Sequence, residues 1–162
     1  MKALPSFLFR ALPLCALICL FIAGCQQQSF PAYKGYKMSP YTVRGVRYVP
    51  MGIDAALRYQ ETGIASHYEA NGARGAIGQR LHRSQFYAAH RTLPLPCRVR
   101  ITNLANGKSC IAEVRDRGPY IPGRLIDVST AVAHKLGFHR KGLERVKVEV
   151  LSVGDGPYRR KR

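Results

Sequence analysis

The sequence predicts a small, mostly β protein with one or two short helices. Short runs of alternating apolar and polar residues recur through the second half of the 162-residue chain, and Gly, Pro and Asn bound them. Helical periodicity, by contrast, is convincing only at 129–136. The length suits one domain and no internal repeat is visible, so we expect a small closed β-barrel.

The first 24 residues have the layout of an export signal. Lys2 and Arg10 stand near an apolar run that ends in Ile22-Ala23-Gly24-Cys25. This run is shorter than the roughly 20 residues that a membrane-spanning helix needs. Its ending resembles a bacterial lipobox, in which the cysteine is lipidated. We therefore expect residues 1–24 to be a lipoprotein signal peptide and Cys25 to carry palmitate-type chains. Gln26, the next residue, favours the outer membrane, facing the periplasm.

Residues 25–62 predict a tether and an N-terminal arm, because they are rich in Gln, Tyr, Pro and Lys without a sustained period. Within the arm, YTVRGVRYVP alternates like a pair of strands about Gly45. The barrel then begins near Gly63, and its last strand is ERVKVEVLSV, with Val146, Val148 and Val150 on one face. The basic tail, 153–162, predicts disorder.

A β-hairpin around Asn106-Gly107 is the clearest local prediction. If Thr102 faces Ser109, then Cys110 faces Ile101 and lies four positions along the strand from Cys97. That gap exceeds the roughly 7 Å that a disulfide allows between its two Cα atoms. An exported cysteine pair favours a disulfide and this register opposes one, so the sequence leaves the pairing open.

The net charge of +17 favours a polyanionic partner. An export signal removes most of the case for nucleic acid, and the anions of a bacterial cell envelope are lipid headgroups and cell-wall polymers. The alternative is that the excess charge only keeps the surface soluble. We predict no nucleic-acid partner.

Six segments together resemble the rare lipoprotein A (RlpA) family. In order they are GIASHYEA, FYAAHRTLP, VRITNLANGKS, VRDRGPYIPGRLIDVS, AVAHKLGF and GLERVKVEVL. The resemblance runs from about Gly63 to Leu151 and implies a six-stranded double-psi β-barrel over 63–152. It also implies a lytic transglycosylase, which cuts peptidoglycan between N-acetylmuramic acid and N-acetylglucosamine and leaves an anhydro-muramic end. It implies no cofactor.

The resemblance assigns Asp116 as the acid that protonates the departing oxygen and then accepts the proton of the attacking hydroxyl. Strand alternation places Arg115 and Arg117 on the opposite face. His90 matches the family's histidine, which we expect to orient the acid. Gln79 stands where the family has a glutamate, and an amide cannot exchange a proton at neutral pH; Glu69 could restore a carboxylate.

Other expected roles follow the same segments. Asp127 and Ser129 are expected to cap the helix at 129–136. No metal site is predicted, because His67, His82, His134 and His139 lack ligand spacing. The expected substrate-binding residues are Tyr68, Arg117, Gly118, Tyr120 and Arg124.

Two hypotheses remain open at this point. In the first, the protein is an envelope enzyme that cuts glycan strands. In the second, Gln79 marks a catalytically impaired relative that binds glycan as a cell-wall anchor or scaffold. No glycan-binding SPOR module is expected after the last strand, so septal targeting is not implied.

Overall fold

The computed structural model describes residues 37–154 and 158–159. The predicted signal peptide, Cys25 and the first part of the tether lie outside the described residues, as do parts of the basic tail. Within the described part of the chain, no helix is long and apolar enough to cross a membrane.

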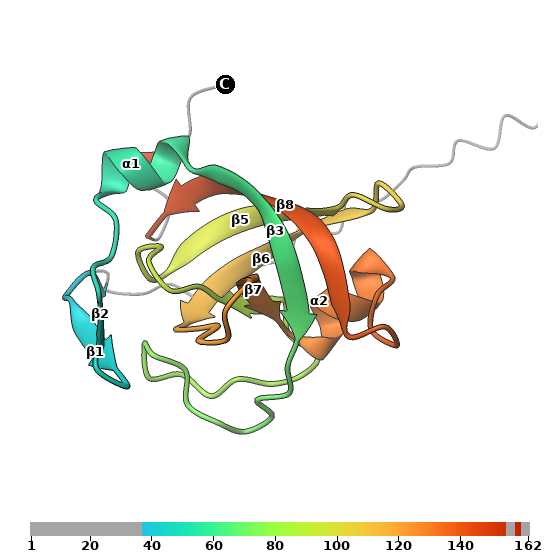
Figure 1. Ribbon diagram of the computed structural model, residues 1–162, viewed down its shortest axis with the longest axis horizontal. Coiled ribbons are helices and arrows are strands. Elements are labelled where there is room, and N and C mark those ends of the chain that lie inside the picture. The colour runs from blue at the N-terminus through green and yellow to red at the C-terminus, as the bar shows by residue number, and fades with distance from the viewer. Residues whose placement is uncertain (1–36, 155–157, 160–162) are drawn as a thin grey trace, which may run out of the picture.

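Six strands close into a barrel (Figure 1). They follow one another in the order β3-β7-β4-β6-β5-β8, and pairing of β3 with β8 closes the ring. The pairs β3–β7 and β4–β6 are parallel, whereas the other pairs of the ring are antiparallel. The predicted mostly β barrel is therefore confirmed. Its strands are β3 (Gln60–His67), β4 (Tyr87–Ala89), β5 (Cys97–Asn103), β6 (Ser109–Asp116), β7 (Arg124–Val128) and β8 (Leu143–Val153).

The barrel interior is filled by alternate side chains of these strands. Val146, Val148 and Val150 are fully buried, which confirms the predicted inward face of β8. Each such side chain contributes roughly 1.5–3 kcal/mol relative to an exposed one. Gly63 allows β3 to lie close to β7, because a Cβ atom there would stand 2.8 Å from the Cβ of Leu125.

The β5–β6 hairpin has the predicted register. Thr102 pairs with Ser109, and Cys110 pairs with Ile101. Cys97 and Cys110 are free thiols. Burial raises the pKa of Cys110 to about 12, so its thiol stays protonated and unreactive at neutral pH.

Helix α2 (Thr130–Leu136) begins and ends as predicted. The Ser129 side chain accepts a hydrogen bond from the backbone N–H of Val132 at 3.3 Å, and Gly137 ends the helix with φ of 80°. The prediction that Asp127 helps to cap this helix is wrong, because Asp127 lies within β7 and bonds to another strand.

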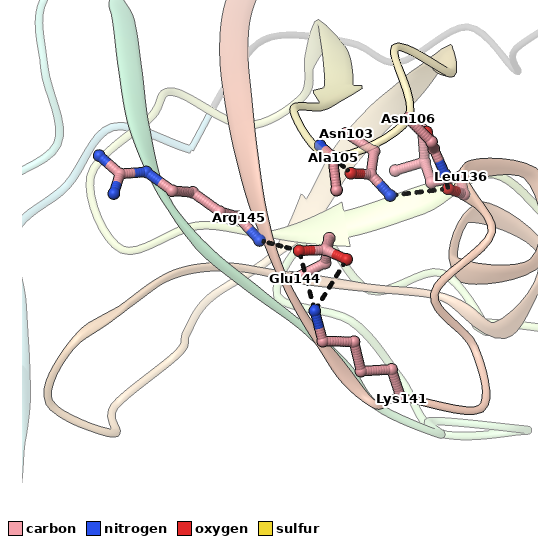
Figure 2. Close-up of polar contacts among 7 residues, drawn as sticks. All are labelled: Asn103, Ala105, Asn106, Leu136, Lys141, Glu144 and Arg145. Atoms are coloured by element: carbon pink, nitrogen blue, oxygen red, sulfur yellow. Dashed lines mark hydrogen bonds and ion pairs between the residues drawn. The ribbon is translucent and has the colours of Figure 1, made fainter.

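The turn of the β5–β6 hairpin is fastened to the end of α2. The side-chain amides of Asn103 and Asn106 each donate to the carbonyl of Leu136 at 3.0 Å (Figure 2). One of the carbonyls that a helix end leaves without an intrahelical donor is thereby satisfied by two side chains. Beyond α2, Glu144 accepts hydrogen bonds from the Lys141 ammonium and from the backbone of Arg145, which holds the start of β8 (Figure 2).

A small hairpin stands beside the barrel (Figure 1). It consists of β1 (Tyr41–Val43) and β2 (Val46–Tyr48), joined by a turn at Arg44 and Gly45 with φ of 50° and 78°. The predicted strand pair about Gly45 is confirmed.

Two elements differ from the sequence prediction. Helix α1 (Ile53–Arg58) lies between the hairpin and the barrel in a segment for which no helix was predicted. Strand β9 (Tyr158–Arg159) pairs with the end of β8, so the prediction of a disordered tail is wrong at these two residues. Edge pairing with β8 supplies backbone hydrogen bonds that the basic composition of the tail does not reveal.

Candidate functional site

Two aspartates flank the short central strand β4. Asp116, at the end of β6, and Asp127, in β7, are both paired with Ala89. Ser66 of β3 pairs in turn with Asp127. Neighbouring strands lie about 4.8 Å apart, so the Cα atoms of the two aspartates are about 10 Å apart. Ser66, Asp127, Ala89 and Asp116 thus form one row across four strands.

Asp116 is held by uncharged donors. Its Oδ1 accepts from the backbone N–H of Ala76 at 3.0 Å and from that of Arg117 at 2.8 Å. Its Oδ2 accepts from the hydroxyl of Tyr68 at 3.4 Å. The carboxylate is half-buried, with one donor from the loop that follows β3 and one from its own strand end. It is therefore fixed in direction while part of it stays accessible.

The two arginines beside Asp116 are engaged elsewhere. Arg115 is buried and pairs with Glu113 at 2.8 Å. The guanidinium of Arg117 donates to the carbonyls of His90, Leu93 and Lys37. Neither guanidinium group donates a hydrogen bond to the Asp116 carboxylate within the described residues. The bonds to the three carbonyls also occupy Arg117, which was expected to bind substrate.

His90 is buried and contacts Asp116 only through the backbone. Its N–H donates to the carbonyl of Asp116 at 3.1 Å. Its ring Nδ1 accepts from the backbone N–H groups of Thr92 and Leu93, and its Nε2 lies 3.0 Å from the hydroxyl of Tyr59. Burial lowers the pKa of His90 to about 3, so the ring is neutral at neutral pH. The ring holds the backbone turn that receives Arg117, rather than the acid itself.

Asp127 supplies a second carboxylate to this row. Its Oδ1 accepts a hydrogen bond from the hydroxyl of Ser66. A Cβ atom on Gly118 would lie 3.6 Å from its Oδ2, so the carboxylate faces the turn that follows Asp116. Burial raises the pKa of Asp127 and the charge of Asp116 raises it further, against the Ser66 hydrogen bond and the charges of Arg124 and Arg91. Sequence reasoning weighed a substrate contact for Asp127 but favoured a role as helix cap.

The alternatives proposed for a second catalytic group occupy other places. Gln79 lies in the loop that carries Ala76, and its two side-chain polar atoms are buried without a hydrogen-bond partner among the described residues. Glu69 is exposed at the start of that loop. An unsatisfied buried amide costs about 1–3 kcal/mol, which a bound hydroxyl group would recover.

The expected substrate-binding residues surround the row of carboxylates. Tyr68 contacts Asp116 and packs edge-on against Tyr87. Gly118 is buried with φ of 135°, and Tyr120 is half-exposed two residues later. Arg124 lies near Asp127, whose pKa its charge lowers. The turn that holds Gly118 and Tyr120 is fixed by a guanidinium, because Arg91 donates to the carbonyls of Pro119 and Arg124 at 3.1 and 2.9 Å.

The N-terminal arm contacts the residues around Asp116 through Lys37. The backbone of Lys37 pairs with that of Leu95, and its carbonyl accepts from Arg117 at 3.0 Å. Its ammonium donates to the carbonyl of Ala76 at 3.1 Å. Because Ala76 is also a donor to Asp116, the arm and the acid are joined through one residue.

Three histidines gather at the C-terminal end of β3, where His67 follows Ser66. The rings of His134 and His139 stack at 3.8 Å, and that of His67 lies 4.7 Å from His139. Burial and the neighbouring His139 lower the pKa of His67. A pocket of about 270 Å³ is lined by His134, Gly137, His139 and Arg140. Across the described ranges, no three or more His, Cys, Asp or Glu side chains are arranged to hold a metal ion.

These observations define a closed six-stranded β-barrel with two aspartates on the strands to either side of β4, the double-psi class. The family model described as "Lytic transglycolase" matches residues 60–148. A protein from Rickettsia bellii, named endolytic peptidoglycan transglycosylase RlpA, is 37% identical over 88% of this chain and 73% of its own length. Its namesake from Pseudomonas aeruginosa is 49% identical over 70% of this chain but only 33% of its own length.

The chain belongs to the RlpA family of double-psi β-barrel proteins. It spans about half or less of several longer curated relatives, including 48% of the one from Neisseria meningitidis. Among solved structures, an expansin of Clavibacter michiganensis in complex with cellohexaose is 15% identical, with a TM-score of 0.49 over 61% of this chain and 54% of the expansin.

Proposed function

We propose that this protein cleaves peptidoglycan glycan strands as an endolytic lytic transglycosylase, with Asp116 as its acid and base. The observation that carries the proposal is the hydrogen bonding of Asp116, which directs a partly accessible carboxyl group at a strand end with uncharged donors only. Two relatives that are 37% and 49% identical to this chain over the aligned residues are named for this activity. The family matched over residues 60–148 supports the same reaction class.

The reaction needs one proton and no water. Protonated Asp116 gives its proton to the glycosidic oxygen, and the bond from that oxygen to the muramic acid C1 breaks. A hydroxyl of the same muramic acid then forms a new bond to C1, which gives the anhydro ring, and its proton passes to the Asp116 carboxylate. Asp116 therefore ends the cycle protonated, as it began.

Asp127 is the second carboxyl group of this proposal. Its raised pKa keeps a proton on it to a higher pH than on an exposed aspartate. In that form it donates a hydrogen bond to the sugar near the reacting centre, while Ser66 fixes its direction. His90 is a positioning residue, since its ring holds the turn whose carbonyls receive Arg117.

A second candidate function is glycan binding without cleavage. It is favoured by Gln79, which stands where the family has a glutamate and whose buried amide has no hydrogen-bond partner in the described part of the chain. A sugar hydroxyl would satisfy that amide in either case. The difference between the two functions is whether Asp116 and Asp127 suffice for cleavage.

Attachment to the envelope belongs to the same proposal. The segment that ends in Ile22-Ala23-Gly24-Cys25 supports export and lipidation at Cys25, and Gln26 supports outer-membrane location, facing the periplasm. Palmitate labelling that disappears in Cys25→Ser, together with loss of the protein from the membrane fraction, is the expected result. Equal labelling of both forms would contradict this attachment.

The test of cleavage is mass spectrometry of denuded and intact glycan strands after incubation with the purified protein. We expect anhydro-muramic ends with the wild type and none with Asp116→Asn. Asp54→Asn makes the same chemical change at an exposed position of α1 and serves as the matched control. Retained glycan binding without any anhydro-muramic product would favour the second function.

A further inference from the structure

Three tyrosines meet beside the Asp116 turn. Tyr41 and Tyr48 come from the β1–β2 hairpin and stack with ring centroids 5.3 Å apart. Tyr120 approaches them from the turn after Asp116, with centroids 6.5 Å from Tyr41 and 5.6 Å from Tyr48. All three rings are partly exposed. The tyrosine cluster, as we call Tyr41, Tyr48 and Tyr120, thus joins the arm to the functional turn.

The hairpin presents one face to this cluster and leaves part of that face uncovered. The register pairs Tyr41 with Tyr48 and Val43 with Val46, and alternation puts these four side chains on the same face. Val46 is nevertheless 53% exposed, as is about half of Ile121 in the turn that carries Tyr120. A hairpin that served only to cover the barrel would bury these side chains. The apolar face therefore continues into solvent beyond the cluster.

The cluster is fixed to the residues that hold Asp116. The Tyr41 hydroxyl donates to the carbonyl of Arg91 at 2.8 Å, and the Arg117 guanidinium lies over the Tyr41 ring at 5.4 Å. Burial raises the pKa of Tyr120, and its hydrogen bond with Tyr41 and the charge of Asp116 raise it further. The Tyr120 hydroxyl is thus close enough to the acid to sense its charge. The surface around Asp116 is continuous with the tyrosine cluster.

We propose that the tyrosine cluster, with the exposed hairpin face beside it, binds a sugar ring of the glycan strand at a distance from the bond that is cut. This inference rests on the proposed function, because the occupant is the same strand that reaches Asp116. Tyrosine rings offer flat apolar faces with a polar hydroxyl, which suits the C–H face of a pyranose and its hydroxyl groups. Continuity with the Asp116 surface favours a glycan over a protein segment as the occupant.

The consequence is a dependence on strand length. A disaccharide whose two rings flank the bond at Asp116 has no further ring for the tyrosine cluster, whereas a long strand contacts both. Loss of the Tyr48 ring should therefore weaken binding of long strands and leave that of a disaccharide unchanged. Tyr48→Phe keeps the ring and should behave like the parent protein.

The experiment measures affinity for denuded glycan strands of many disaccharides and for a single GlcNAc–MurNAc disaccharide. It uses the full chain carrying Asp116→Asn, so that strands are not cut. We expect Tyr48→Ala to bind long strands roughly tenfold more weakly, with unchanged disaccharide affinity. Thr42→Ala, on the opposite hairpin face, is the matched control, and thermal unfolding of each variant tests whether the hairpin stays folded.

Each other outcome would refute either the sugar site alone or the sugar site together with the proposed function. Equal binding of long strands by Tyr48→Ala and its parent would refute the sugar site at the tyrosine cluster and leave the proposed function standing. An equal loss for long strands and disaccharide would assign Tyr48 to the fold alone and also refute the site. A parent that binds neither ligand, when the wild type also cuts no glycan, would overturn the proposed function and this inference together.

Discussion

The surroundings of Asp116 and Asp127 differ in how they are built. Asp116 is held by backbone N–H groups and by Tyr68, and one of these donors, Ala76, comes from a loop far away in sequence. Asp127 is held by Ser66, its partner in the register of β3 and β7. The first setting depends on loops and on the N-terminal arm, whereas the second is part of the barrel ladder. Two carboxyl groups in one row therefore have different surroundings, while the charge of Asp116 still raises the pKa of Asp127.

The largest expected effect is on turnover when Asp116 loses its acidity. Asp116→Asn keeps the shape of the side chain and its place beside Tyr68, but it cannot give or take a proton. We expect at least a thousandfold fewer anhydro-muramic ends per unit time, with thermal unfolding close to that of the wild type. Turnover within tenfold of the wild type would remove Asp116 from the chemistry.

The same substitution at Asp127 tests whether the two aspartates have different roles in turnover. Asp127→Asn keeps a hydrogen-bond donor but cannot titrate, so its kcat should stay within about tenfold of the wild type, whereas Asp127→Ala, which removes the donor, should lower kcat about a hundredfold with little change in KM. Ser66→Ala should act more mildly and through the pKa of Asp127, because the Ser66 hydrogen bond lowers that pKa. The pH limb that reports Asp127 should therefore move to higher pH in Ser66→Ala. A rise in KM alone would assign Asp127 to binding.

Substitution of His90 tests how much the turn beside Asp116 contributes to the stability of the fold. Its pKa is about 6.5 in the unfolded chain and about 3 in the folded protein. Below pH 6.5 the unfolded chain therefore binds a proton that the folded protein does not bind. This group contributes stability that is intact at neutral pH and is lost as pH falls, about 2 kcal/mol between pH 7 and pH 5. Urea unfolding at several pH values should show that loss for the wild type.

His90→Asn is the matched comparison, because an amide oxygen can still accept from the N–H groups of Thr92 and Leu93 but does not titrate there. The difference in unfolding free energy between the two proteins should shrink as pH falls. Parallel curves across this range would mean that the buried ring is not what resists protonation.

The smallest expected effect concerns Gln79. Gln79→Glu places the family's carboxylate in the loop that carries Ala76, and we expect turnover equal to the wild type or up to about tenfold higher. If the wild type forms no anhydro-muramic ends and the variant does, then Asp116 and Asp127 do not suffice and the glycan-binding function is correct. Product counts from both proteins decide the point.

Local patterns in the sequence predicted local structure well. Asn106-Gly107 specifies a tight turn, and the hairpin register followed from it. Ser129 and Gly137 predicted the two ends of α2. The pattern of short strands predicted a small β-barrel, and the resemblance to the RlpA family supplied its six-stranded double-psi topology, because pairing between distant strands leaves little trace in a single sequence.

The site shows where such reasoning stops. Asp127 precedes a helix and was therefore interpreted as a cap, yet parallel pairing of β3 with β7 brings Ser66 to it. His67, His134 and His139 have no regular spacing and still meet in space, because the end of β3 lies beside α2 and the turn before β8. Contacts of this kind depend on sheet order, which residue spacing does not encode.

The contacts of Lys37 determine where the arm meets the barrel. Its carbonyl accepts a hydrogen bond from Arg117, and its ammonium donates one to the carbonyl of Ala76. Both of these residues lie beside Asp116, at the edge of the site. If Cys25 carries the lipid, about a dozen residues separate the anchor from this edge, and such a length spans at most about 40 Å. The tether would then join the barrel beside the Asp116 site, and that site would reach only the layer of cell wall nearest the membrane.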